Sequence, residues 1–160
     1  MSSRPWSPYD NLTVRRLLAI LALGLLCPAA SSARLQEGAL EAARKQALAE
    51  GKYLYVAFLG EGWSVSCKRF QEKVLDDPLF KQFARDHLVY FPVQARRKPP
   101  LSKEETAVLQ SWVIHFDIKA YPTLILIAPD GNELLRHGYK DLDGPDYVDL
   151  LRNLLPPSGN

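Results

Sequence analysis

The sequence predicts an α/β domain in which helices flank a mixed, four-stranded β-sheet. Apolar runs typical of strands at 53–59 and 88–94 are separated by a helical segment, which is the pattern of a parallel βαβ unit. Runs at 123–128 and 133–137 flank the turn residues 129–132 and predict an antiparallel hairpin. Pro92 cannot donate a backbone hydrogen bond, so the 88–94 strand is expected at an edge of the sheet.

Helix signals stand before, between and after these strands. Residues 35–50 carry an apolar face and are followed by Gly51; that face consists of Leu40, Ala43, Ala47 and Leu48. N-cap residues predict three further helix starts, at Ser64, Asp77 and Ser102. Gly144 and Pro145 introduce a closing helix.

Residues 1–33 have the features of a secretory signal peptide. Arg15 and Arg16 precede an apolar run over 17–27 that is short for a bilayer span, and small residues follow as far as Ala33. We expect cleavage near Ala33, one domain over 34–155 and a disordered tail over 156–160. The alternative is an uncleaved segment 17–27 that anchors the domain to the membrane. In both cases the domain is exported, to the periplasm or the cell exterior.

The charge and cysteine content of the expected mature chain limit its function. The whole chain has 20 basic and 18 acidic residues; the leader holds Arg4, Arg15, Arg16 and Asp10, so 17 of each sign remain after it is removed. This balance gives no support to nucleic-acid binding. Cys67 is the only cysteine outside the leader, so no intrachain disulfide is possible in the mature chain.

Two short motifs carry a family resemblance. Residues 62–68, Gly-Trp-Ser-Val-Ser-Cys-Lys, resemble the Trp-Cys-x-x-Cys-Lys turn of the thioredoxin superfamily, with Ser64 at the first cysteine's position. Residues 121–123, Tyr-Pro-Thr, resemble the family's cis-proline segment. The similarity extends over roughly 40–155 and is strongest to periplasmic thioredoxin-like domains of the thiol-disulfide interchange type. It implies a thioredoxin-like fold with strand order second, first, third, fourth, and a cis-proline before the third strand. It also implies electron transfer between dithiols, or reduction or isomerisation of protein disulfides.

The sequence departs from this family at two positions. A serine hydroxyl is essentially un-ionised at neutral pH and cannot form a disulfide, so Ser64 excludes dithiol exchange within this site. Many relatives carry a buried acid on the strand before the turn, where this chain has Ala57 and Phe58. Ser64 is also a favoured N-cap, and Cys67 is also suited to burial as a small apolar residue.

The sequence therefore predicts an exported thioredoxin-fold protein with a degenerate Ser-x-x-Cys site, formed by Ser64 and Cys67. Its predicted activity is binding of thiol-containing or unfolded protein partners without dithiol exchange. One alternative is a monothiol thiol-disulfide oxidoreductase, in which Cys67 forms mixed disulfides with a protein or a small thiol. Another is a structural accessory subunit of an envelope complex.

The expected partner surface is a groove beside the turn, made by Trp63, Tyr121, Pro122 and Thr123. No cofactor is expected. The three histidines, His87, His115 and His137, occur at element ends without ligand spacing, so no metal site is predicted and they are expected at the surface or a sheet edge. Membrane contact is expected only if the leader stays uncleaved.

Overall fold

The computed structural model describes residues 29–155. Residues 1–28 of the expected leader and the whole expected tail at 156–160 lie outside the described residues. The elements in chain order are α2 (Ala29–Glu50), β1 (Tyr53–Glu61), α3 (Val65–Phe70), the π-helical turn η2 (Gln71–Leu75), α4 (Pro78–His87), β2 (Leu88–Arg96), α5 (Lys103–His115), β3 (Thr123–Ile127), β4 (Glu133–His137) and α6 (Gly144–Arg152).

The strands form one mixed, four-stranded sheet in the order β2-β1-β3-β4. Strands β1 and β2 are parallel, and β1 pairs with β3, and β3 with β4, in the antiparallel sense. The predicted α/β class and strand order are therefore confirmed. Pro92 lies opposite Ala57 in the edge strand β2, which is the position predicted from its missing N–H.

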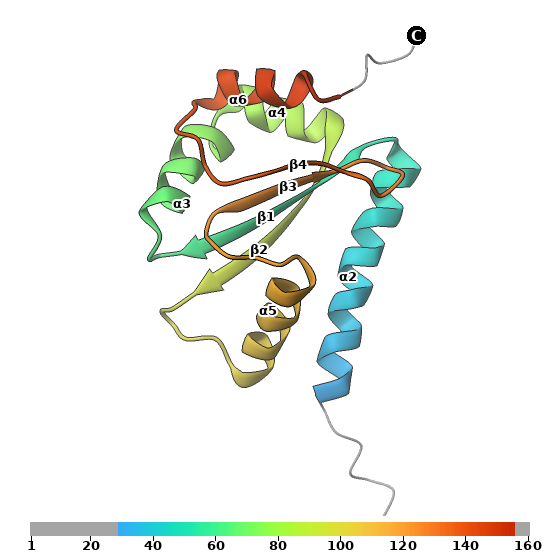
Figure 1. Ribbon diagram of the computed structural model, residues 1–160, viewed down its shortest axis with the longest axis vertical. Coiled ribbons are helices and arrows are strands. Elements are labelled where there is room, and N and C mark those ends of the chain that lie inside the picture. The colour runs from blue at the N-terminus through green and yellow to red at the C-terminus, as the bar shows by residue number, and fades with distance from the viewer. Residues whose placement is uncertain (1–28, 156–160) are drawn as a thin grey trace, which may run out of the picture.

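Helices cover both faces of the sheet, with α3, α4 and α6 on one side and α2 and α5 on the other (Figure 1). Strand β1 is buried from Leu54 to Gly60 because it has a neighbouring strand at each edge and helices on each face. Its side chains alternate between the two layers. Tyr55, Ala57 and Leu59 face the α3 side, whereas Phe58 packs on the α2 side.

The predicted helix at 35–50 is longer in the structure and buries a narrower face. Helix α2 begins at Ala29 and so includes the expected cleavage position, Ala33. Leu40, Ala43 and Ala47 are buried, but Leu48 is 64% exposed, so its expected place on the buried face is wrong. Leu48 follows Ala47 by one residue and is therefore turned about 100° away around the helix. No helix within residues 29–155 is long and apolar enough to cross a membrane.

The predicted helix starts agree with the structure. Ser64, Asp77 and Ser102 each occupy an N-cap, and their side chains accept backbone N–H bonds. Helix α6 begins at Gly144, and its cap is the preceding residue, Asp143. These caps satisfy amide groups that would otherwise lack partners at the helix ends, and they fix where each helix leaves the sheet.

Candidate functional site

The site is built on the tight connection between β1 and α3. Gly62 has a φ of +73°, a conformation that glycine adopts without strain. Ser64 is extended, with φ −95° and ψ 114°, and its Oγ accepts a bond from the Cys67 amide at 3.3 Å. This cap starts α3 and places Cys67 one turn inside the helix.

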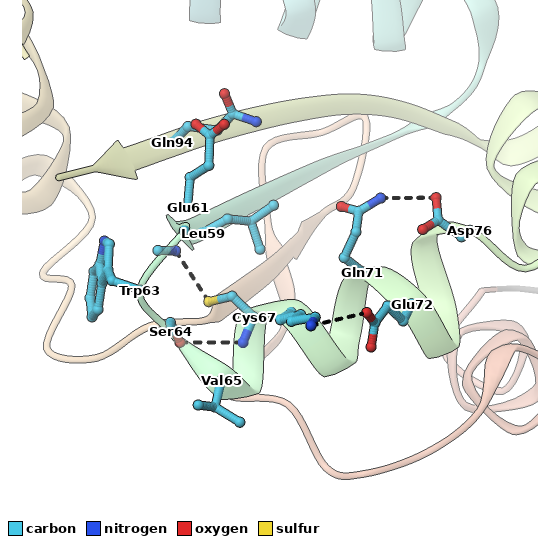
Figure 2. Close-up of a pocket in the computed structure, with 13 residues that line it drawn as sticks. Leu59, Glu61, Trp63, Ser64, Val65, Cys67, Gln71, Glu72, Asp76 and Gln94 are labelled. Carbon is cyan, nitrogen blue, oxygen red and sulfur yellow. Dashed lines mark hydrogen bonds and ion pairs between the residues drawn. The ribbon is translucent and has the colours of Figure 1, made fainter. Parts of the chain in front are cut away.

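The Cys67 side chain points from α3 toward the end of β1 (Figure 2). It is 6% exposed, and its Sγ accepts a bond from the Gly60 amide at 3.1 Å. It packs in the same apolar cluster as Ala57, Leu59 and Phe70. Ser64 and Cys67, predicted together from the motif, are thus adjacent, and each has a structural hydrogen bond.

The buried acid of the family pattern has no counterpart beside Cys67. Ala57 faces the Cys67 cluster, and Phe58 faces the opposite side of the sheet. No charged side chain is buried among residues 38–155, so no buried carboxylate there is available to accept a proton from the thiol.

Trp63 is held in one orientation by three neighbours. Its indole Nε1–H donates to the Ala95 carbonyl of β2 at 2.6 Å. The Arg97 guanidinium lies 4.1 Å from the centre of the ring, within the range of a cation–π contact. The Tyr121 ring meets it edge to face, with centroids 5.5 Å apart. These contacts therefore restrict the tryptophan side chain to one orientation.

The Tyr121 to Thr123 segment lies beside Trp63, through the contact between the Tyr121 and Trp63 rings. The peptide bond between Tyr121 and Pro122 is cis, Pro122 is buried, and the Thr123 hydroxyl donates to the Ala120 carbonyl at 2.8 Å. Burial raises the pKa of the Tyr121 hydroxyl, and the negative charge of a Cys67 thiolate raises it further. Tyr121 is therefore close to both Trp63 and Cys67.

A cavity of about 520 Å³ opens between α3 with η2 and the carboxyl ends of β1 and β2, with Trp63 in its wall (Figure 2). We call it the Cys67 cavity. Its wall consists of Leu59, Gly60, Glu61, Gly62, Trp63, Ser64, Val65, Cys67, Lys68, Gln71, Glu72, Asp76 and Gln94. None of residues 121–123 lines it.

Sequence inspection did not anticipate the outer residues of the Cys67 cavity. Gln94 lies beside Leu59 because parallel pairing of β1 and β2 sets those two residues opposite each other. Asp76 comes from the far end of η2 and accepts a bond from Gln71 at 3.0 Å. The register of the two strands determines which β2 residue neighbours Leu59, and no local sequence pattern sets that register.

The described histidines are separate from this site. His87 ends α4, His115 ends α5 and His137 ends β4. Within the part of the chain that the structure describes, no three His, Cys, Asp or Glu side chains are grouped as metal ligands. His137 is half-buried at an edge strand and bonds to the Tyr147 hydroxyl at 2.9 Å.

Comparison with known proteins identifies the family. The sequence profile of the thioredoxin-like domain matches residues 40–153. The chain belongs to this thioredoxin-like family, as the two motifs predict.

Individual relatives agree with this assignment. The chain is 26% identical over 125 residues to the disulfide bond reductase DsbH of Chlamydia pneumoniae, covering 78% of this chain and 75% of that protein. A solved DsbH oxidoreductase superposes with a TM-score of 0.64 at 26% identity, covering 71% of this chain and 78% of the other. The reduced C-terminal domain of DsbD from Neisseria meningitidis gives a TM-score of 0.57 at 18% identity, covering 74% and 96%. The last similarity concerns the fold alone.

Proposed function

We propose that this protein is exported and binds cysteine-containing or unfolded segments of partner proteins through its thioredoxin fold, without exchanging a dithiol of its own. The observation that carries this proposal is the chemistry of positions 64 and 67. Dithiol exchange needs one sulfur to attack and a second to resolve the mixed disulfide. Ser64 supplies an oxygen at the first position, and among residues 29–155 Cys67 holds the only sulfur.

The environment of Cys67 further supports a non-exchanging site. With 6% of its surface exposed and its Sγ bonded to the Gly60 amide, the thiol is poorly placed to meet a disulfide on another molecule. Buried free cysteines commonly act as small apolar residues. The Ser64 oxygen is also occupied, as the cap of α3.

The proposed partner surface is the groove of Trp63, Tyr121, Pro122 and Thr123. Trp63 offers flat aromatic area, and its three neighbours have already restricted its orientation. A side chain ordered before binding loses little conformational entropy when a partner docks. The aromatic pair Trp63 and Tyr121 therefore favours binding of an extended, partly apolar segment of a partner protein.

The second candidate is a monothiol oxidoreductase, which the similarity to the disulfide bond reductase DsbH and the opening of the Cys67 cavity favour. In that case the Cys67 thiolate attacks a partner disulfide R–S–S–R′. A bond forms between Cys67 Sγ and the sulfur of R, and R′ leaves as a thiolate that takes up a proton. A second thiol of the partner then displaces Cys67 and restores its free form.

Two assays on the chain beginning at Arg34 test the proposal. Trp63 and Trp112 are its only tryptophans, so a Trp112→Phe background leaves Trp63 as the fluorescent reporter of binding to an unfolded, cysteine-containing peptide. We expect saturable binding that is equal in the parent protein and in Cys67→Ala. We also expect dithiothreitol-driven insulin reduction at the uncatalysed rate in both.

Other outcomes separate the candidates. Insulin turnover that disappears in Cys67→Ala would replace the binding proposal with the monothiol enzyme. If neither peptide binding nor insulin turnover is found, both the binding protein and the monothiol enzyme are excluded. Export is tested independently by N-terminal sequencing of the protein recovered outside the cytoplasm, which should begin near Arg34; full-length protein in the cytoplasm would contradict it.

A further inference from the structure

Three side chains from three elements form a hydrogen-bonded chain through the core beneath α6. The Tyr55 hydroxyl of β1 lies 2.8 Å from the Tyr147 hydroxyl of α6, and that hydroxyl lies 2.9 Å from His137 Nε2 of β4. His137 Nδ1 is bonded to the Gly138 carbonyl. Tyr55 and Tyr147 are fully buried. Because both hydroxyls are shielded from water, each depends on this chain for its partner.

The partners determine the direction of every bond. A carbonyl oxygen only accepts, so Nδ1 of His137 carries the hydrogen that is shared with Gly138. In the neutral ring Nε2 is then an acceptor, and the Tyr147 hydroxyl donates to it. The Tyr55 hydroxyl in turn donates to Tyr147. The hydroxyl hydrogens of Tyr55 and Tyr147 therefore occupy the two hydrogen bonds that join the three side chains.

Protonation of His137 introduces a third hydrogen into these two links. Nε2–H must then donate to the Tyr147 oxygen, which leaves the hydrogen of either Tyr147 or Tyr55 without an acceptor in the chain. The surroundings are aromatic: Phe80 meets both tyrosine rings edge to face, and Phe70 meets Tyr147 in the same way. The ring of Tyr90 on β2 stacks on Tyr55 without a hydrogen bond between the two side chains. A buried hydroxyl hydrogen without an acceptor is unfavourable, so the protonated form opposes close packing of α6.

No counter-charge among residues 38–155 offsets this effect. Burial lowers the pKa of His137 from its usual value of 6.5, the Gly138 carbonyl opposes that shift, and the positive charge of Lys140 adds to it. Tyr147 faces the ring from α6, and the strand neighbour on β3 is the apolar Leu124. Among residues 38–155 no carboxylate bonds to or pairs with His137.

We propose that Tyr55, Tyr147 and His137 form a pH-sensitive latch, in which protonation of His137 releases α6 from β1 and β4. The latch is closed at neutral pH and opens in mildly acidic surroundings. The sign follows from linkage: the unfolded chain binds the proton more readily than the folded chain does, so the stability contributed by neutral His137 is lost as the pH falls from 6.5 through the folded pKa.

The test is thermal unfolding at pH 7.5 and pH 5.0 of the chain from Arg34, followed by circular dichroism. We expect the melting temperature to fall by about 5 °C in the parent protein, as one lost buried hydrogen bond implies. In His137→Gln, which does not titrate, that fall should be absent. In Tyr147→Phe the melting temperature should be lower at pH 7.5, and its further fall at pH 5.0 should be smaller than in the parent. His115→Gln, at an exposed histidine, is the matched control and should behave as the parent.

Several results would overturn the latch. An equal fall in melting temperature in the parent and in His137→Gln would show that other groups cause the pH dependence. If the melting temperature of Tyr147→Phe falls as much as that of the parent, burial of the His137 ring alone would explain the pH dependence. If the variants do not fold, nitrogen chemical shifts of His137 in the parent decide, because the latch requires the hydrogen on Nδ1 at neutral pH. Amide exchange should also accelerate in α6 relative to α5 at pH 5.0, after correction for intrinsic rates.

Discussion

Gly60 of β1 packs against Trp63 and Ser64 of the turn, and replacing it with alanine tests the site's packing. A Cβ at Gly60 would lie 2.6 Å from Cζ2 and 2.8 Å from Cε2 of Trp63, and 2.9 Å from the Ser64 Cβ. Trp63 cannot rotate away freely because its Nε1–H is bonded to Ala95 and its ring contacts Tyr121. The Ser64 Cβ is fixed to the backbone. Either the turn or Trp63 must therefore move.

The magnitude follows from these contacts. Forcing one extra carbon into a packed site costs about 1–3 kcal/mol. Displacing Trp63 also removes its bond to the Ala95 carbonyl, which contributes roughly 1 kcal/mol. We therefore expect Gly60→Ala to lower the free energy of unfolding by about 2–4 kcal/mol.

Urea unfolding followed by circular dichroism measures this change, and reaction of Cys67 with a chromogenic disulfide measures exposure of the thiol. The thiol should react faster in Gly60→Ala, since the amide that bonds to its sulfur belongs to residue 60. Gly38→Ala is the matched control: nothing lies within 4 Å of its Cβ, and it lies in α2, so it should stabilise by about 0.5–1 kcal/mol. Unfolding of Gly60→Ala within 0.5 kcal/mol of the parent would refute this view of the turn.

Three further substitutions test other parts of the account. Ser64→Ala removes the cap of α3 and should lower the free energy of unfolding by about 1 kcal/mol, measured with urea; unchanged stability would contradict the capping role. Asp77→Ala removes a side chain that accepts two backbone N–H bonds at the start of α4, so a loss of about 1 kcal/mol is expected, and a neutral result would exclude that cap. Arg97→Ala removes the cation above Trp63 at an exposed site. It should destabilise by about 0.5–1 kcal/mol and shift the fluorescence of Trp63; an unaltered spectrum in a Trp112→Phe background would argue against the contact.

Local rules were sufficient to predict the sheet edge and most helix starts. Pro92 requires an edge because of a single missing N–H, and the caps at Ser64, Asp77 and Ser102 act within three residues. The place of Ser64 and Cys67 likewise followed from one short turn. Features that depend on a few neighbouring residues are therefore accessible without a structure.

Features that depend on distant contacts were not predicted. The Cys67 cavity requires the register that sets Gln94 beside Leu59, and no local pattern determines it. His137 was expected at the surface or a sheet edge; it does end an edge strand, but Tyr147 of α6 covers it. The failure at Leu48 has the same cause, because the width of a buried helix face depends on what packs against it.

The mass of Ser64→Cys after mild oxidation shows directly whether the turn can hold a disulfide between positions 64 and 67. If the turn keeps dithiol geometry and lacks only its first sulfur, the variant will form a disulfide with Cys67, lose two hydrogens and gain insulin-reducing turnover that the parent lacks. Two thiols that stay free and separately alkylated in the folded variant would contradict the account.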